Sequence, residues 1–255
     1  MKNYNQRNVF IAGGTSGIGL ALATLYLEKG FRVAICGRDV SKIPTSVSGQ
    51  LQSFCADVCD PASLSSAIDI FLDRGHLDLF INCAGSYAED VAGNITYEEA
   101  EEMLKTNILG AVNCFEAARK AMNNRKGKIA VIASVSGILD YEKSSLYTKT
   151  KRSVIQIADA YHRALKPFGI SVTTIAPGYV DTPKLRALNN NDLHKKPFLT
   201  DVTSAAVLIS QAIDLEKKLF IFPSKMKWMM TALSLLPSSL LNLIMFRKAK
   251  WMTRD

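Results

Sequence analysis

Short apolar segments rich in β-branched residues alternate along the chain with longer segments in which apolar residues recur at helical spacing. The short segments have the length and composition of buried β-strands, and the long ones are typical of helices that pack on a sheet. The predicted strands are residues 9–12, 31–36, 51–58, 77–82, 128–133, 170–175 and 219–222. The predicted helices include residues 18–29, 61–74, 98–124 and 144–167.

Regular alternation of strand and helix predicts the fold class. Consecutive parallel strands need a crossover, normally a helix, so the pattern indicates an α/β protein with a doubly wound, seven-stranded, mostly parallel sheet and helices on both faces. A chain of 255 residues, 48% of them hydrophobic, suits one such domain. We expect it to occupy residues 1–225, with residues 226–255 as an apolar, helical extension of the same domain.

Composition and charge narrow the class of protein. The five cysteines and three histidines lack the spacing of metal ligands, and no N-terminal signal peptide is evident, so we expect a cytoplasmic protein without a metal. The net charge is +8, and eight Lys or Arg residues against Asp255 alone place +7 of it after residue 216. These cations flank an apolar segment and do not line a polar groove, which argues against nucleic acid as a partner.

A glycine-rich segment follows the first predicted strand and precedes the first predicted helix. Glycines in such a turn let backbone N–H groups and the positive end of a helix dipole approach a pyrophosphate without interference from a Cβ atom. The segment reads Gly13-Gly14-Thr15-Ser16-Gly17-Ile18-Gly19. It predicts a dinucleotide site with contacts at Gly13, Thr15, Ser16, Gly17, Ile18 and Gly19.

Four polar residues further along stand out by their positions in the predicted helices and strands. Tyr147 and Lys151 are four residues apart in a predicted helix, so they share one face, and the ammonium is expected to lower the pKa of the phenol from its usual value near 10. Ser134 directly follows the fifth predicted strand, where its hydroxyl can hold an oxygen that gains charge. Asn107 lies inside a predicted helix, which an asparagine is expected to open locally.

In this order and at these spacings, the glycine segment and the four polar residues resemble the short-chain dehydrogenase/reductase family, classical type. The resemblance extends over residues 9–183 and implies a Rossmann fold. It departs from the family at Ala12, where threonine is usual, and at Cys83, where a second asparagine is usual.

The resemblance also implies the role of each site residue. The implied catalytic residues are Asn107, Ser134, Tyr147 and Lys151. The implied cofactor contacts beyond the glycine segment are Asp57, Val58, Asn82, Ala84, Gly85, Tyr147, Lys151, Pro177, Gly178, Val180 and Thr182.

The end of the second predicted strand bears on which nicotinamide cofactor is used. An NAD-selective site places a carboxylate against the adenosine ribose hydroxyls, whereas a guanidinium attracts the 2′-phosphate of NADP. Gly37 stands where the resemblance places the NAD-type acid, and Arg38 follows it. NADP(H) is therefore favoured over NAD(H), although Asp39 keeps NAD open as an alternative.

Together these features predict an NADPH-dependent reductase that moves hydride between nicotinamide and a small carbonyl compound or secondary alcohol, with Tyr147 as general acid and base. The resemblance implies a homodimer or homotetramer. Three alternatives are an NAD-linked alcohol or hydroxysteroid-type dehydrogenase, an extended-group epimerase or dehydratase, and a catalytically silent nucleotide-binding scaffold. Few residues remain after Pro183 for the substrate domain of the extended group.

Substrate recognition is expected in residues 184–200 and in the C-terminal extension. Residues 228–246 are apolar, but Pro237 and several polar residues divide them into two short helices, so we do not expect them to span a bilayer. Three interpretations stay open: a peripheral anchor on the inner membrane face, an apolar lid over the pocket, and a subunit-packing element. The first two favour a lipophilic or acyl-chain carbonyl substrate.

Overall fold

The computed structural model describes residues 6–88, 95–123 and 125–252, with side chains up to residue 245. Its centre is a seven-stranded, all-parallel sheet in the order β3-β2-β1-β4-β5-β6-β9. The strands are β1 (Asn8–Ala12), β2 (Arg32–Gly37), β3 (Gln52–Cys55), β4 (Leu79–Asn82), β5 (Gly127–Ile132), β6 (Ile170–Pro177) and β9 (Leu219–Phe222). The predicted fold class is confirmed.

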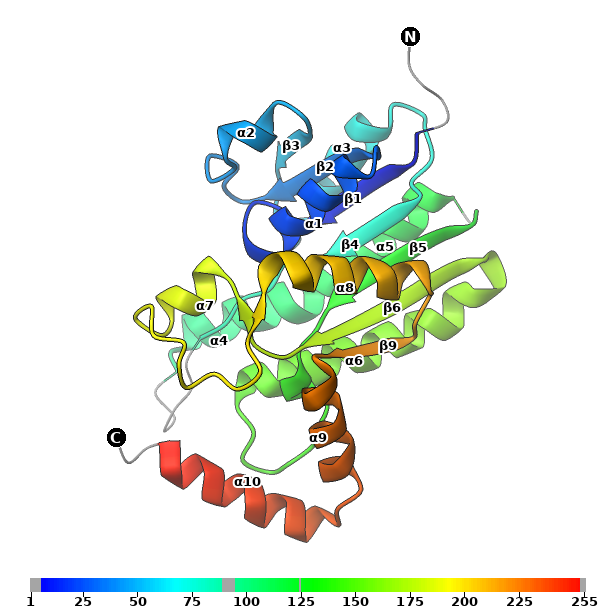
Figure 1. Ribbon diagram of the computed structural model, residues 1–255. Helices are drawn as coiled ribbons and strands as arrows, with labels where there is room; N and C mark the ends of the chain where they lie inside the picture. The colour runs from blue at the N-terminus through cyan, green and yellow to red at the C-terminus, as the bar shows by residue number, and fades with distance from the viewer. Residues whose placement is uncertain (1–5, 89–94, 124, 253–255) are drawn as a thin grey trace.

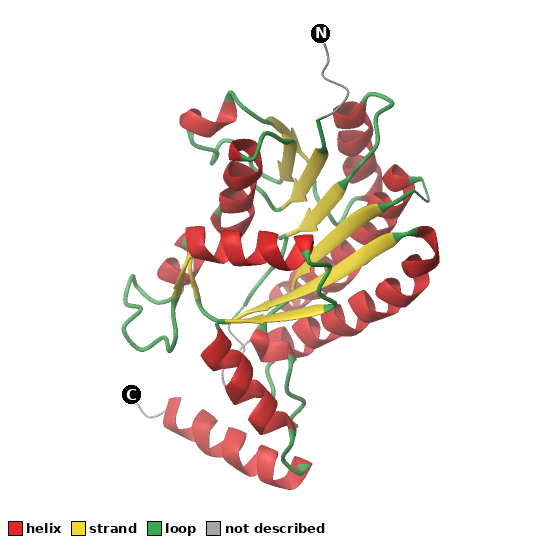
Figure 2. Ribbon diagram, turned by 45° about the vertical axis from the view of Figure 1, so that its right-hand side comes forward, coloured by secondary structure: helices red, strands yellow, loops and turns green. Residues whose placement is uncertain are grey.

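Helices cover both faces of this sheet (Figures 1 and 2). They are α1 (Gly17–Glu28), α2 (Thr45–Ser48), α3 (Pro61–Leu72), α4 (Tyr97–Leu104), α5 (Gly110–Met122), α6 (Leu146–Leu165), α7 (Pro183–Ala187), α8 (Val202–Asp214), α9 (Ser224–Ser234) and α10 (Ser238–Met252). α1 and α8 pack on one face, and α3, α5 and α6 pack on the other. Two short strands, β7 (Val180–Asp181) and β8 (Thr200–Asp201), form a second sheet that was not predicted.

β1 shows why the strands read as continuous apolar runs. Val9 and Ile11 pack into the core beneath α1 and α8, while Phe10 and Ala12 pack into the core beneath α3, α5 and α6. All four side chains are fully buried, as expected of a strand covered on both faces. The strand order turns back between β1 and β4, and the carboxyl ends at such a switch point form the usual ligand crevice of doubly wound sheets.

The predicted helix over residues 98–124 is divided in the structure. α4 begins after a capping box in which Thr96 and Glu99 each accept a hydrogen bond from the other's backbone N–H. A π-helical turn at Lys105–Leu109 then separates α4 from α5. Asn107 lies in this turn, so the local opening expected at that position is confirmed; residue 124 lies outside the described residues.

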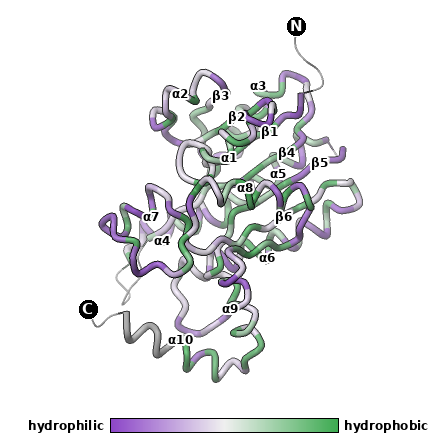
Figure 3. The backbone as a smooth tube through the Cα atoms, viewed as in Figure 1, coloured by the Kyte–Doolittle hydropathy of each residue, from purple (hydrophilic) through white to green (hydrophobic). Residues whose placement is uncertain are grey.

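The C-terminal extension consists of α9 and α10, which are divided at Pro237 as predicted. In Figure 1 they stand off the β9 edge of the sheet, and Figure 3 shows the apolar character of the first part of α10. Two of their side chains, Met226 and Leu241, are buried. Within the described part of the chain, no helix has the length and apolarity needed to cross a membrane.

Candidate active site

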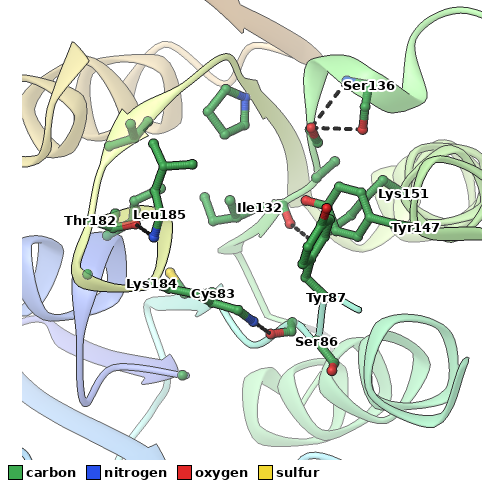
Figure 4. A pocket seen from close by; sticks show the side chains of 18 of the residues that line it. Cys83, Ser86, Tyr87, Ile132, Ser136, Tyr147, Lys151, Thr182, Lys184 and Leu185 are labelled. Carbon is green, nitrogen blue, oxygen red and sulfur yellow. Dashed lines mark hydrogen bonds between the residues drawn. The ribbon is translucent and has the colours of Figure 1, made fainter. Parts of the chain in front are cut away.

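A cavity of about 850 Å³ opens at the carboxyl ends of the central strands (Figure 4). Its wall begins at the glycine segment after β1 and includes the residues that follow β4, β5 and β6. It ends at methionines of α9 and α10. The cavity therefore joins the predicted cofactor site to the C-terminal extension.

Backbone geometry at the glycine segment fits a pyrophosphate. Gly13 has a φ of +73°, and a Cβ atom there would lie 2.5 Å from the backbone nitrogen of Ala84. A Cβ atom on Gly19 would lie 2.2 Å from the carbonyl oxygen of Gly13. Side chains are thus excluded where the backbone must come close to a ligand, and α1 begins beside the cavity at Gly17 with the positive end of its dipole.

Ser134 and Tyr147 come together at the cavity wall from two neighbouring elements. Ser134 follows β5, and its Oγ accepts hydrogen bonds from the backbone nitrogen of Ser136 at 3.2 Å and from its hydroxyl at 3.0 Å. Ser145 caps α6 by accepting a 3.1 Å hydrogen bond from the backbone nitrogen of Thr148, which fixes the turn that carries Tyr147. Figure 4 shows Tyr147 and Lys151 on the same side of the cavity.

The pKa of Tyr147 does not shift as the four-residue spacing predicts. Burial raises it to about 12, the hydrogen bond with Ser134 lowers it in part, and the neighbouring Tyr87 raises it further. The predicted lowering by Lys151 is therefore wrong in direction for this arrangement. The loss of hydration of a buried phenolate is the largest cause of the rise.

Burial disfavours the charged form of Lys151. It is buried, and its Nζ donates a 3.2 Å hydrogen bond to the carbonyl oxygen of Ile132 and lies 5.8 Å from the ring centre of Tyr147. Burial lowers its pKa to about 8, the charge of Lys184 lowers it as well, and Cys83 raises it. A cation of this kind can exchange protons near neutral pH.

Asn107 lies behind the cavity wall and is held on all sides. Its Nδ2 donates to the carbonyl oxygen of Ser86 at 2.9 Å and to the hydroxyl of Thr150 at 3.0 Å, and its Oδ1 accepts from the backbone nitrogen of Ser86 at 2.9 Å. A Cβ atom on Gly85 would lie 3.1 Å from Nζ of Lys151 and 3.3 Å from Oδ1 of Asn107. The two polar atoms therefore face the same point beside Gly85.

The rim near the end of β2 is cationic. Arg38 lines the cavity, is 66% exposed and pairs with Glu102 of α4 at 3.0 Å. A Cβ atom on Gly37 would lie 2.8 Å from the methyl carbon of Thr15, so a side chain there would have to displace that residue. Asp39 is engaged locally, since it accepts hydrogen bonds from Ser41 and pairs with Lys42 at 3.3 Å.

Most predicted cofactor contacts lie on the cavity wall. Those that line it are Gly13, Thr15, Ser16, Gly17, Ile18, Gly19, Arg38, Asp57, Val58, Ala84, Gly85, Tyr147, Lys151, Pro177, Gly178, Val180 and Thr182. Asn82 does not; it is buried behind the wall, where its Oδ1 accepts a 2.9 Å hydrogen bond from the backbone nitrogen of Ala84. It therefore shapes the loop after β4.

Lys184 is a site residue that the sequence motifs do not indicate. It comes from α7, and its Nζ reaches the other side of the cavity, where it donates to the carbonyl oxygen of Gly85 at 3.2 Å (Figure 4). Partial burial lowers its pKa, Glu102 raises it, and Arg38 lowers it. The sequence indicates only that Lys184 begins the segment 184–200, in which substrate recognition was expected, directly after the Thr182-Pro183 pair.

The substrate end of the cavity is aromatic and apolar. The ring of Tyr87 stands edge-on to that of Tyr147, with the centres 5.0 Å apart and the planes at 75°. The far wall is formed by four methionines of the C-terminal extension. They are Met226, Met229, Met230 and Met245. The interpretation of the C-terminal extension as an apolar lid pointed to this region, but no motif singles out the four methionines, because their position depends on how α9 and α10 pack.

Over residues 6–88, 95–123 and 125–252, no group of three or more His, Cys, Asp or Glu side chains is arranged to hold a metal ion.

Comparisons with known proteins agree with this geometry. Residues 7–193 match the family model described as short chain dehydrogenase. The chain is 31% identical over 211 residues to 3-dehydrosphinganine reductase from Arabidopsis thaliana, covering 78% of this chain and 62% of that relative. It is 31% identical over 199 residues to an uncharacterised oxidoreductase from Staphylococcus haemolyticus, covering 72% of this chain and 82% of the relative.

Solved structures show the same fold. ElxO with bound NADP superimposes with a TM-score of 0.75 at 25% identity, covering 85% of this chain and 96% of that chain. A variant of actinorhodin polyketide ketoreductase with NADPH gives a TM-score of 0.77 at 20% identity, covering 89% and 99%. The chain belongs to the short-chain dehydrogenase/reductase family and is an NAD(P)-dependent short-chain oxidoreductase.

Proposed function

We propose that this protein is an NADPH-dependent reductase that transfers hydride between the nicotinamide and a lipophilic carbonyl compound or secondary alcohol, with Tyr147 as general acid and base. The observation that carries the proposal is that Ser134, Tyr147 and Lys151 share the wall of one cavity with the glycine segment. Fold by itself would not establish this, because function depends on the site.

The charges around the cavity support NADPH over NADH. Five lining side chains are cationic and one is acidic. They are Arg38, Lys42, Lys143, Lys151 and Lys184 against Asp57. NADPH adds a 2′-phosphate to the diphosphate that both cofactors share, so it gains more from an excess of cations. The alternative is an NAD site in which Asp39 binds the adenosine ribose. It is less favoured because Asp39 already accepts a hydrogen bond from Ser41 and pairs with Lys42.

The glycine segment after β1 and the residues after β6 would hold the cofactor, whose nicotinamide would supply hydride to the substrate carbon. Tyr147 donates its phenolic proton to the substrate oxygen, and the Ser134 hydroxyl holds that oxygen as charge develops. With a pKa of about 12, the Tyr147 phenol stays protonated at neutral pH. This protonated phenol is the form that proton donation to the substrate oxygen requires.

We propose that Lys151 and Asn107 return the proton to Tyr147. Lys151 titrates near pH 8, so it is largely protonated at neutral pH and can still give up its proton. Its Nζ and the Oδ1 of Asn107 face a common point beside Gly85, where a proton-carrying group could bridge them. Asn107 is rigidly held by Ser86 and Thr150, which suits a positioning residue.

The substrate end supports an apolar or acyl-chain compound. Methionine side chains are unbranched and adaptable, and they fit flexible alkyl chains. The 3-dehydrosphinganine reductase relative is named as a reductase, which favours the reductive direction, although this chain spans 62% of that relative's length.

We also propose that the protein is a homodimer or homotetramer in the cytoplasm, with peripheral contact to the inner membrane face through residues 226–255. All five cysteines are unpaired thiols, in keeping with a reducing compartment. Residues 226–255 are proposed to be an extension of the domain formed by residues 1–225, since buried Met226 packs against the Pro-Gly loop at Gly178.

Titration with NADPH and NADH, followed by nicotinamide fluorescence, tests the cofactor assignment. Wild type should bind NADPH more tightly, and Arg38→Ala should lose about tenfold in NADPH affinity with little change for NADH, because a charge-assisted hydrogen bond to the 2′-phosphate is removed. Arg186→Ala is the matched control, since Arg186 pairs with Asp181 and does not line the cavity. Tighter binding of NADH that Arg38→Ala leaves unchanged would favour the NAD-linked dehydrogenase, and binding of neither cofactor would favour the silent scaffold.

A further inference from the structure

The C-terminal extension forms part of the active-site wall. Met226 and Met230 of α9 and Met245 of α10 line the cavity. α10 is also tied to the loop between β5 and α6, because Oδ1 of Asn242 accepts a 3.1 Å hydrogen bond from the backbone nitrogen of Glu142. The inner side of α9 and α10 thus faces the place where the proposed substrate lies.

The outer side of the same two helices is apolar and exposed. Trp228 is 74% exposed and Leu235 80% exposed. Further exposed apolar side chains outside the cavity wall are Leu240, Leu243 and Ile244. Scattered exposed apolar residues are ordinary, but a group gathered on two consecutive helices is typical of an interaction surface. Figures 1 and 2 show these helices projecting from the body of the molecule, so the surface is accessible.

The charge of this region identifies the kind of partner. Residues 223–254 contain six Lys or Arg residues and no Asp or Glu. Lys225 and Lys227 lie exposed beside Trp228 on α9. A surface that combines exposed apolar side chains with cations alone complements an anionic lipid surface, where tryptophan and lysine anchor helices at the headgroup level. A second copy of the same surface would bring like charges together.

We propose that α9 and α10 lie flat on an anionic phospholipid bilayer through Trp228, Leu235 and their neighbours, and that the carbonyl substrate reaches the methionine wall from the bilayer. Docking rests on the tail alone, whereas the route of the substrate rests on the proposed reductase function. α10 has 15 residues, so it is about 22 Å long, less than the hydrocarbon thickness of a bilayer, and an orientation along the surface is the one that fits.

Vesicle sedimentation with the full chain tests docking. The probes are vesicles of phosphatidylcholine alone and of phosphatidylcholine with phosphatidylglycerol in equal parts. We expect at least tenfold tighter binding to the anionic vesicles, and a loss of at least fivefold of that binding in Trp228→Ser/Leu235→Ser. The control is Ile70→Ser/Leu215→Ser, which removes apolar side chains of similar exposure, 64% and 69%, from α3 and from the end of α8.

The outcomes separate membrane docking from its alternatives. Equal binding to both vesicle types, or equal losses in the two double variants, would overturn the proposal. So would a tail variant that dissociates an oligomer in light scattering while vesicle binding stays at the wild-type level, because a second copy of the chain would then cover the surface. NADPH affinity should be unchanged in both variants, which shows that each is folded.

Activity tests the route of the substrate. With NADPH, Trp228→Ser/Leu235→Ser should lose at least fivefold in the rate on 2-dodecanone held in anionic vesicles and keep the wild-type rate on 2-butanone in water. If the variant kept the wild-type rate on 2-dodecanone as well as on 2-butanone, the proposed route of the substrate would be overturned. Vesicle binding in the absence of any ketone reduction would contradict the proposed function and leave docking standing.

Discussion

The cofactor end of the cavity and its methionine end depart from ordinary protein interiors in opposite ways. At the cofactor end, the ammonium of Lys151 is buried, and it lies close enough to Lys184 for that second charge to lower its pKa. At the methionine end, large apolar side chains are left exposed on α9 and α10. The buried charge and the exposed apolar side chains each lower the stability of the folded protein. Each is explained by a ligand of complementary chemistry, an anion for the charge and an apolar partner for the side chains.

The largest expected effect is on kcat and comes from Tyr147, which lies between the cofactor end and the methionine end of the cavity. Tyr147→Phe removes the proton donor while keeping the ring, so kcat for ketone reduction should fall by about a thousandfold, within the range for general acid catalysis. NADPH affinity should stay within about twofold of wild type, since the ring remains. Tyr97→Phe is the control because Tyr97 is 76% exposed on α4. Stopped-flow measurement of NADPH oxidation would show the difference, and a loss below tenfold would contradict the role of Tyr147.

The second prediction concerns the buried cation itself. Lys151→Met should abolish most activity and yet raise the free energy of unfolding at pH 7 by about 2 kcal/mol. The pKa of Lys151 is lowered from 10.5 to about 8 in the folded protein, so between these values the unfolded chain binds the extra proton. The penalty for charging Lys151 is therefore complete below pH 8 and disappears as pH rises through 10.5.

Urea denaturation of wild type and Lys151→Met at pH 7 and pH 10.5 measures this penalty. The gain in stability should be present at pH 7 and nearly absent at pH 10.5. The hydrogen bond to Ile132 that the variant loses lowers its stability at both pH values, so it reduces the gain at pH 7 and leaves the variant no more stable than wild type at pH 10.5. Lys149→Met is the control, since Lys149 is an exposed lysine on the same helix. A variant less stable than wild type at pH 7 would show that the charge of Lys151 does not destabilise the folded protein.

Sequence patterns predicted the cofactor end better than the methionine end, and the reason is physical. The glycine segment acts through the local backbone, so its spacing already implies the tight turn seen at Gly13 and Gly19. The same holds for the π-helical turn at Asn107, which followed from the poor fit of asparagine in a helix. The seven strands were found because burial on both faces leaves long apolar runs.

Other features depend on tertiary packing that local patterns do not contain. Spacing placed Tyr147 and Lys151 on one helix face, but it carried no information on how deeply each would be buried, and the direction of the Tyr147 pKa shift was wrong for that reason. The β7–β8 sheet consists of two-residue strands, too short for any periodic signal. Which side of α9 lines the cavity depends on its packing after β9, and the mixed apolar and polar sequence of α9 does not decide it.

The third prediction tests whether Lys184 of α7 contributes to binding of the cofactor. Lys184→Met should weaken NADPH and NADH alike, by about tenfold, because a cation across the cleft favours the diphosphate that both cofactors carry. This differs from Arg38→Ala, which should affect NADPH alone. Fluorescence titration of both cofactors gives the two ratios, with Lys196→Met as the control, since Lys196 does not line the cavity. A loss confined to NADPH would place Lys184 at the 2′-phosphate.

The smallest expected effect concerns Met230 in the methionine wall and the preference of the enzyme for long ketones over short ones. Met230→Ala removes an apolar contact from the cavity wall, so kcat/KM for a long ketone such as 2-undecanone should fall by about fivefold relative to that for 2-butanone, in line with the modest worth of a few methylene contacts. Thr231→Ala, an exposed neighbour outside the cavity wall, should leave the ratio of the two kcat/KM values unchanged. Because both ketones share the same reacting group, a change in the ratio reports chain binding and not the chemistry at Tyr147. Equal losses for both ketones would instead mean that α9 supports the catalytic residues and has no part in selecting the chain.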